Sequence, residues 1–279
     1  MKGVSRNGSS EDLRRMKVTY VAPFRALVAA LALGVVANAA TAQTTEQTAG
    51  GEVMVVRPFS IGERLTYAVK VGPLGRGTAV AELRNIDTVR GQRVFHSVFQ
   101  MSGSLLFFKV RDEYESWFDP STFVSLRYRQ DIDQGSYERN RTYEIIPERG
   151  IYIDADKSEK ATVEQPLDDG AFLYFLRTIP FEVGKTYSFN RYFKPDRNPV
   201  RVTVVRRERI RVPAGEFDAV VLQPKIKAKG IFAENANAEV WISDDDNRMM
   251  LQMRTRMPFG AVTFQLRTRE VVKPALAER

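Results

Sequence analysis

The sequence predicts a mainly β protein: an antiparallel, strongly curved sheet or open barrel built from two pseudo-repeats, with one short inserted helix. Three observations lead to this prediction. Short segments of alternating apolar and polar residues, separated by turn residues, follow one another along most of the chain after residue 57, which is typical of antiparallel strands. Landmarks of the first half return in the same order in the second half. One short segment carries apolar residues at helical spacing instead.

The repeat rests on three pairs of segments. They recur at offsets of 122 to 124 residues: 58–63 (PFSIGE) with 180–185 (PFEVGK), Gly91 with Gly215, and 115–119 (ESWFD) with 239–243 (EVWIS). Self-similarity at a nearly constant offset indicates two copies of one unit of about 110 residues. We therefore predict that Trp117 and Trp241 occupy equivalent strands.

The predicted strands follow from the alternation. In repeat one they are 65–71, 79–83, 94–100, 114–118, 124–128 and 141–145, and in repeat two 200–205, 219–222, 239–242, 249–253 and 261–266. The helix prediction rests on Asp168 and Asp169, two acids suited to capping, and on the apolar residues that follow them and stop before Pro180.

Residues 1–42 are expected to be a signal peptide. Residues 26–40 are apolar, Lys17 and Arg25 precede them, and residues 40–42 (ATA) fit a small-x-small cleavage site. The apolar run is shorter than the roughly 20 residues that cross a bilayer. A core helix, the other interpretation, would not carry such a cleavage site.

We place the cleavage before Gln43, and Met16 is an alternative start of the leader. The chain has 0 Cys, so neither a lipid anchor on cysteine nor a disulfide is expected. The expected location is therefore the periplasm, reached through the cleavable signal peptide and without a lipid anchor.

The remaining chain divides into a linker and one domain. Residues 43–56 are polar and predict a flexible linker. A single β-domain should span residues 57–273, with repeat one over 57–166, the helix over 168–178 and repeat two over 179–273. Without a disulfide, burial of a core must stabilise this domain, and its length is sufficient for that.

The charge balance argues against nucleic-acid binding. The whole chain has a net charge of +8, but removal of the leader lowers the Lys and Arg count from 42 to 36 and the acid count from 34 to 32. A net charge of +4 is mild and does not imply a nucleic-acid partner.

Four segments together resemble a known family. They are 62–67 (GERLTY), 109–120 (KVRDEYESWFDP), 212–219 (VPAGEFDA) and 240–245 (VWISDD). The combination is similar to the markers of the bacterial exported family known as domain of unknown function 3108, over about residues 57–270. The resemblance implies an exported, β-rich protein. The family has no assigned reaction, so the resemblance implies no catalytic residue.

Candidate catalytic or metal-binding residues are few. His96 is the single histidine, and no nucleophile motif accompanies it. Zinc of the usual kind needs several His or Cys ligands. Residues 244–247 (DDDN) lack the glycine and distal Glu of an EF-hand and read as a turn. Glu113 and Glu115 are spaced like a glycosidase pair, as are any two acids at i and i+2 of a strand. We predict no catalytic residue, no metal and no cofactor.

Basic residues recur at i and i+2 on several predicted strands. The sets are Arg127/Arg129, Arg139/Arg141, Arg207/Arg209/Arg211, Lys225/Lys227/Lys229, Arg254/Arg256 and Arg267/Arg269. This spacing places each set on one strand face, with Leu126 and Tyr128 on the face opposite Arg127. If the faces join, they would bind anionic lipid or glycan groups. The alternative is a solvated face with cross-strand Arg–Glu pairs. The ligand-binding candidates are Arg127, Arg129, Lys225, Lys227 and Lys229.

Two apolar segments precede the tryptophan strands. Residues 105–108 (LLFF) and 230–232 (GIF) occupy matching places in the two repeats. Phe107, Phe108 and Phe232 are therefore further ligand-binding candidates, as flaps over a hydrophobic cavity. They could equally be hairpin ends packed into the core.

These observations favour a non-catalytic protein that binds an amphipathic or anionic ligand of the cell envelope, a lipid or an anionic glycan, with peripheral membrane contact. An adaptor protein of the envelope and a hydrolase of envelope polysaccharide are the alternatives. A binder should have an apolar cavity between the repeats, an adaptor a filled core, and a hydrolase acids that converge in a cleft. The oligomeric state stays open.

Overall fold

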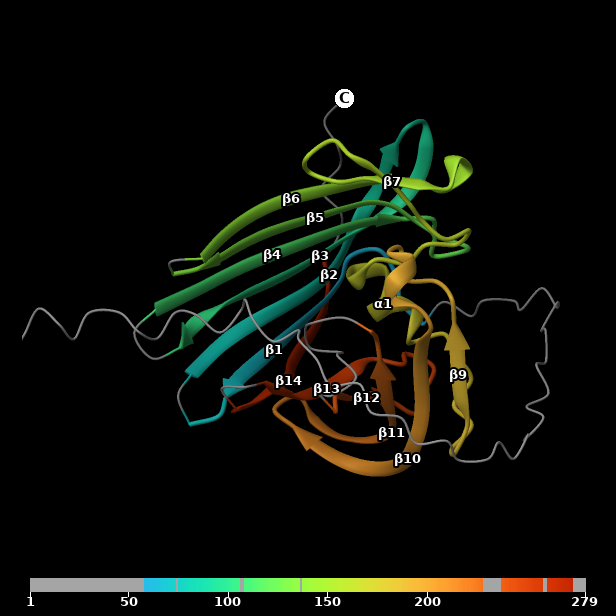
Figure 1. Ribbon diagram of the computed structural model, residues 1–279. Helices are drawn as coiled ribbons and strands as arrows, with labels where there is room; N and C mark the ends of the chain where they lie inside the picture. The colour runs from blue at the N-terminus through green and yellow to red at the C-terminus, as the bar shows by residue number, and fades with distance from the viewer. Residues whose placement is uncertain are drawn as a thin grey trace, which may run out of the picture. The chain divides into compact units, whose positions relative to one another are not determined.

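The computed structural model describes residues 58–73, 75–105, 108–135, 137–227, 237–257 and 260–272. They contain one 14-stranded sheet in the order β8-β7-β6-β5-β4-β3-β2-β1-β14-β13-β12-β11-β10-β9, and every pair of neighbouring strands is antiparallel (Figure 1). The edge strands β8 and β9 do not pair with each other, so the sheet is not closed. The predicted fold class is confirmed.

The strand bounds exceed the predicted ones at most positions. They are β1 Glu63–Val71, β2 Gly75–Val89, β3 Gln92–Leu105, β4 Phe108–Phe118, β5 Ser125–Gln134, β6 Tyr137–Ile146, β7 Ile151–Ile153, β8 Glu159–Ala161, β9 Thr186–Phe189, β10 Val200–Val212, β11 Gly215–Lys225, β12 Glu239–Ser243, β13 Met250–Met257 and β14 Gly260–Val271. The predicted signal peptide and linker, residues 1–56, lie outside the described residues. No helix among the described residues is long and apolar enough to cross a membrane.

The two halves share a hydrogen-bonding pattern. Gly62 and Gly184 both have positive φ, 87° and 88°, which glycine adopts without strain. The Gly62 N–H donates to the Leu83 carbonyl at 2.7 Å, and the Gly184 N–H donates to the Val204 carbonyl at 2.8 Å. The next irregularity of the ladder follows Leu83 on β2 and Val204 on β10. The same feature, a glycine with positive φ whose N–H bonds a strand carbonyl, therefore occurs at the start of each half.

The tryptophan strands also match. Trp117 lies on β4 and Trp241 on β12, which are the fourth strands of the series that begin at β1 and β9. In both halves the register shifts directly after the tryptophan, at Phe118 and at Ile242. These equivalences support two pseudo-repeats, which the β1–β14 pair joins into one sheet.

Among the described residues the one α-helix, α1 (Asp169–Phe175), lies between β8 and β9 in the chain, inside the predicted 168–178. Asp168 caps it, because one carboxylate oxygen accepts from the Gly170 and Ala171 N–H groups at 2.8 and 2.9 Å. The helix packs on β3 and β4 (Figure 1). A Cβ on Gly170 would lie 2.7 Å from the Ser116 Cβ, so the glycine permits this close approach.

The face of the sheet that α1 covers, called the inner face here, carries the main hydrophobic core. A smaller cluster of Val89, Val94, Trp117 and Leu126 lies on the other, outer face. The prediction that Leu126 lies opposite Arg127 is wrong. Leu126 packs with Trp117, and the Arg127 guanidinium lies 5.7 Å from the centroid of the same ring. The irregularity in the β4–β5 ladder explains this, because a bulge opposes two residues to one.

Candidate ligand-binding site

The basic candidates are not neighbours in the sheet. Arg127 and Arg129 lie on β5, Lys225 ends β11, and Lys227 follows it. Seven strands separate β5 from β11 in the sheet order. Phe107, Lys229 and Phe232 lie outside the described residues, and only the backbone of Phe108 is described. Pairing within the sheet therefore does not bring the described basic candidates together.

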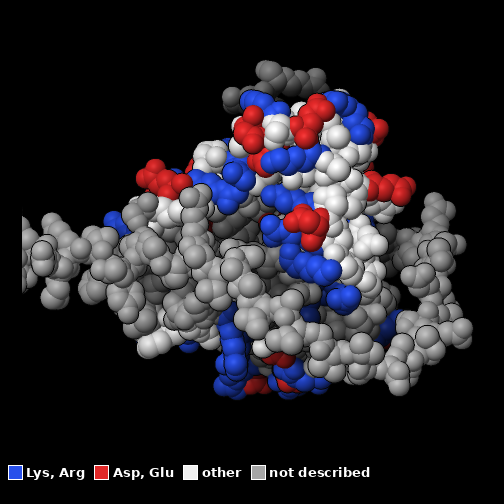
Figure 2. Space-filling view, viewed as in Figure 1, with Lys and Arg blue, Asp and Glu red and all other residues white. Residues whose placement is uncertain are grey.

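Outer-face arginines already have carboxylate partners. Arg127 bonds Glu144 at 2.5 Å, and Arg129 bonds one oxygen of Glu115 at 2.9 Å. Figure 2 shows Lys and Arg beside Asp and Glu on the face in view. Much of this surface is therefore a solvated face with cross-strand ion pairs, which was the alternative to an anion-binding face. Each such pair contributes little to stability.

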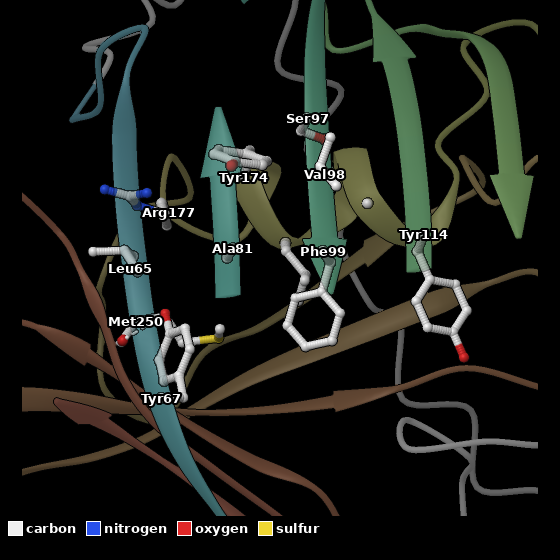
Figure 3. A pocket seen from close by; sticks show the side chains of 12 residues that line it. Leu65, Tyr67, Ala81, Ser97, Val98, Phe99, Tyr114, Tyr174, Arg177 and Met250 are labelled. Carbon is white, nitrogen blue, oxygen red and sulfur yellow. Dashed lines mark hydrogen bonds between the residues drawn. The ribbon is translucent and has the colours of Figure 1, made fainter. Parts of the chain in front are cut away.

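The inner face holds a pocket next to α1. Its lining comes from both repeats and the helix and includes Leu65 and Tyr67 of β1, Phe99 of β3, Tyr114 of β4, Tyr174 of α1 and Met250 of β13 (Figure 3). Its volume is about 30 Å³, which is room for water molecules only. The core under α1 is therefore filled. A ligand larger than water would have to lie on the inner face beside this pocket.

Two acids at the start of α1 are fully bonded within the fold. The second oxygen of Asp168 accepts from the Ser116 hydroxyl at 2.7 Å. Asp169 accepts from the Tyr128 and Tyr192 hydroxyls at 3.0 and 3.1 Å. Burial raises the pKa of Asp168 to about 7 and also raises the pKa of Asp169. Because both carboxyls serve helix capping and packing, they do not form a free catalytic pair.

Past the pocket, away from α1, the inner face becomes polar. Asp112 of β4 and Arg139 of β6 lie in one cross-strand row, on either side of Ile132 of β5. Oδ1 of Asp112 and Nε of Arg139 are buried and have no hydrogen-bond partner among the described residues. Burial raises the pKa of Asp112, although Gln134 donates to its other oxygen at 2.7 Å. Buried polar atoms are normally bonded, so an unbonded donor and acceptor in one row indicate a missing partner.

Positively charged side chains gather around Tyr143, close to this row. Arg139, Arg141 and Lys194 donate to the hydroxyl of Tyr143 at 3.3, 3.2 and 3.1 Å. Asp154 lies 3.6 Å from Arg141 and pairs more closely with Lys160, at 2.8 Å. A neutral hydroxyl accepts at most two hydrogen bonds and neutralises no charge, so Arg139 and Lys194, which have no salt bridge among the described residues, can still bind an anion. The inner face of the first half thus becomes cationic at Arg139, Arg141 and Lys194.

Sequence reasoning missed this site, although a signal was present. Arg139 and Arg141 share strand parity with Tyr143 and Ile145, which are buried in the core. Extending that parity along β6 would have placed both arginines on the inner face. The burial of Asp112 had no comparable signal.

The other chemical candidates are structural. His96 stacks on Trp117, with ring centroids 4.4 Å apart, and bonds Glu115 at 2.9 Å. Burial lowers the pKa of His96, and the Glu115 hydrogen bond opposes that shift. The described part of the chain holds no group of three or more His, Cys, Asp or Glu that could hold a metal ion.

This geometry defines an open, antiparallel β-barrel-like protein with a polar site on the inner face of its first repeat. A family model described as "Protein of unknown function (DUF3108)" matches residues 65–267. The chain belongs to this family. None of the curated proteins matches it.

The comparison with solved structures gives two matches of different quality. One is a β-barrel-like protein of domain of unknown function DUF1849 from Brucella abortus, with a TM-score of 0.52 and 9% identity over 76% of this chain and 98% of that chain. The hypothetical protein CT021 from Chlamydia trachomatis has a TM-score of 0.32 and 8% identity, over 79% of this chain and 94% of that chain. The first similarity supports the β-barrel-like fold and nothing about function.

Proposed function

We propose that this protein binds, without catalysis, an amphipathic anionic molecule of the cell envelope on the inner face of the first repeat. The observation that carries the proposal is the pair of unbonded buried atoms, Asp112 Oδ1 and Arg139 Nε, in one row of the inner face. A ligand with both a hydroxyl group and an anionic group would satisfy the acceptor and the donor together.

The apolar part of such a ligand has a surface next to that row. Phe99 and Tyr114 are register partners on β3 and β4, both are partly buried, and both line the pocket. Tyr114 and Asp112 are two residues apart on one strand face. An acyl or other apolar group on these rings would leave its polar end at Asp112, Arg139 and Arg141. The expected periplasmic location would bring the protein to envelope lipids and acidic glycolipids.

The test is native mass spectrometry of the protein purified from its own cell envelope. We expect a co-purified lipid or glycolipid on the wild type and its loss from the variant Asp112→Asn/Arg139→Gln. The control variant is Arg149→Gln/Glu159→Gln, since this ion pair is 54% and 50% exposed and lies outside the inner-face site. It should keep the adduct. A wild type without any adduct would contradict the proposal and favour the adaptor function, with which the filled core agrees.

A further inference from the structure

A second recess lies on the outer face, where β1, β14 and β13 run side by side. Its volume is about 380 Å³, and it is lined by Lys70, Gly72, Gln252, Arg254, Ala261, Thr263 and Gln265. Volumes of this order are typical of small-molecule sites. The lining holds two cations, two amides and a hydroxyl, and no acid. It belongs to the face opposite the inner-face site, because Lys70 alternates with the buried Val69 on β1.

The two cations flank one residue. Lys70 of β1 and Arg254 of β13 are both register partners of Thr263 on β14, from its two sides. Neighbouring strands are about 4.8 Å apart, so the two Cα atoms lie roughly 10 Å from each other. Both side chains are long and exposed. They can therefore reach the same group above Thr263.

Neither cation has an acid partner within the part of the chain that the structure describes. The acid nearest in register is Glu239, the cross-strand partner of Arg254. It bonds Arg206 at 2.7 Å. Lys70 instead faces Arg76 across the β1–β2 ladder. Like charges directly opposite each other destabilise a sheet, so this arrangement has no stabilising role in the fold.

Neutral donors complete the recess. Gln265 donates to the carbonyl oxygen of Gln252 at 2.9 Å. The Gln252 oxygen is thereby occupied, while its amide group keeps its donors for another partner. The Thr263 hydroxyl lies between the two cations in register. Arg is suited to several hydrogen bonds with one oxyanion, and Lys adds a mobile point charge.

We propose that this recess, the outer-face recess, is a second binding site that takes a phosphate group. A phosphate group offers more acceptor oxygens than a carboxylate, and the recess offers two cations with amide and hydroxyl donors. Further cations lie in the same cross-strand row. Lys70 pairs in register with Arg76 on β2, Arg76 pairs with Ser104 on β3, and Ser104 pairs with Lys109 on β4. A phosphate at the recess would neutralise the repulsion between Lys70 and Arg76. The group can come from a phospholipid headgroup or from a soluble phosphate compound.

Calorimetric titration with inorganic phosphate, and co-sedimentation with phosphatidylglycerol and phosphatidylcholine vesicles, test this site at constant ionic strength. The variant Lys70→Gln/Arg254→Gln should weaken binding at least tenfold. The control Arg209→Gln/Arg211→Gln removes the same charge from exposed residues that pair with Glu216 and should bind like the wild type. The variant Asp112→Asn/Arg139→Gln should also bind like the wild type, which separates this site from the inner-face site.

Binding to phosphatidylglycerol vesicles alone would identify a lipid headgroup, and binding to inorganic phosphate alone would identify a soluble compound. Either result, if lost in Lys70→Gln/Arg254→Gln and kept in the control, supports the site. No binding of either probe by the wild type, or equal loss in both charge variants, would overturn it.

Discussion

The inner faces of the two repeats carry different side chains on the same strand pattern. In the first repeat Ser97 of β3 pairs in register with Ser116 of β4. At the equivalent place in the second repeat, Leu222 of β11 pairs with Val240 of β12, and both of these side chains are 0% exposed. The second repeat therefore uses this position as hydrophobic core, whereas the first uses it for polar contacts.

The helix explains part of the difference. Ser116 donates to the Asp168 carboxylate, and Ser125 on β5 accepts from the Asp168 N–H at 2.9 Å. These hydroxyls hold the start of α1 against the first repeat, so this repeat cannot be aliphatic there. Asp112 and Arg139 each keep one buried atom without a partner among the described residues, and these two atoms are what points to a ligand on the first repeat.

The two tryptophans make similar polar contacts. The Trp117 indole N–H donates to Asp87 at 2.8 Å, and the Trp241 indole N–H donates to Glu208 at 2.5 Å. The Arg206 guanidinium lies 5.8 Å from the Trp241 ring centroid, much as Arg127 lies over Trp117. The two tryptophans thus share an indole–carboxylate hydrogen bond and an arginine over the ring, although Trp117 packs in the smaller cluster and Trp241 in the main hydrophobic core.

The largest effect on stability is expected at Arg177, which bonds residues of both repeats. Arg177, 3% exposed, bonds Glu63 at 2.5 Å and donates to the carbonyls of Asn247 and Arg248 at 2.9 and 2.8 Å. Arg177→Met leaves the Glu63 carboxylate buried, so we expect a loss of about 3–5 kcal/mol in the free energy of unfolding. Urea denaturation measures it.

The double variant Glu63→Gln/Arg177→Met is the control for that prediction. It removes both charges, so it should recover part of the stability that Arg177→Met loses. A loss below about 1 kcal/mol in the single variant would mean that the ion pair does not tie the repeats together.

The next effect tests the contrast between the inner faces directly. Leu222→Ala opens a cavity in the aliphatic core of the second repeat and should cost about 2–5 kcal/mol of unfolding free energy. Ser97→Ala, at the matching place in the first repeat, removes one hydroxyl and should cost no more than about 1 kcal/mol. Equal losses in the two variants would show that the repeats use this position in the same way.

Asp168, which caps α1, gives the stability of the fold a pH dependence. Its folded-state pKa, about 7, lies above its ordinary value of 3.8, so the folded protein binds this proton more tightly than the unfolded chain. Stability contributed by the protonated form is full at low pH and falls as the pH rises from about 4 to 7. Asn still caps a helix, so Asp168→Asn should remove that decline.

The measurement is the difference between variant and wild-type stability at a series of pH values, which cancels the contribution of all other groups. The difference should grow with pH by at most roughly 4 kcal/mol. A constant difference from pH 4 to pH 7 would contradict the raised pKa of Asp168.

Local patterns were enough to predict the architecture. Alternation predicted the strands, and the acids at Asp168 and Asp169 predicted the start of the helix, because both depend on nearby residues. The location of the basic residues was harder. The bulge at Leu126 reverses the alternation on β5, and whether Arg127 and Lys225 meet depends on the strand order of the whole sheet.

The inner-face site also depends on long-range packing. The burial of Asp112 arises from contacts with other strands, and alternation along β4 says only which residues share its face. Arg139 could have been placed by its parity with Tyr143, but its unbonded Nε could not. Polar atoms without partners become visible only when their surroundings are known.

The smallest effects should come from the arginine ion pairs beside the two tryptophans, where the repeats agree. Arg127 pairs with Glu144, and Arg206 pairs with Glu239; the two arginine side chains are 35% and 38% exposed. Solvent screens such pairs, and a partly exposed cation over an aromatic ring adds about 0.5–1 kcal/mol. Arg127→Gln and Arg206→Gln should therefore each lower the free energy of unfolding by about 1 kcal/mol or less, and by similar amounts. Urea denaturation of both variants at low and high salt measures this, with a smaller loss expected at high salt because ions screen surface pairs. A loss at Arg127 several times that at Arg206 would show that the repeats differ on the outer face too, and that the first repeat's specialisation is not confined to its inner face.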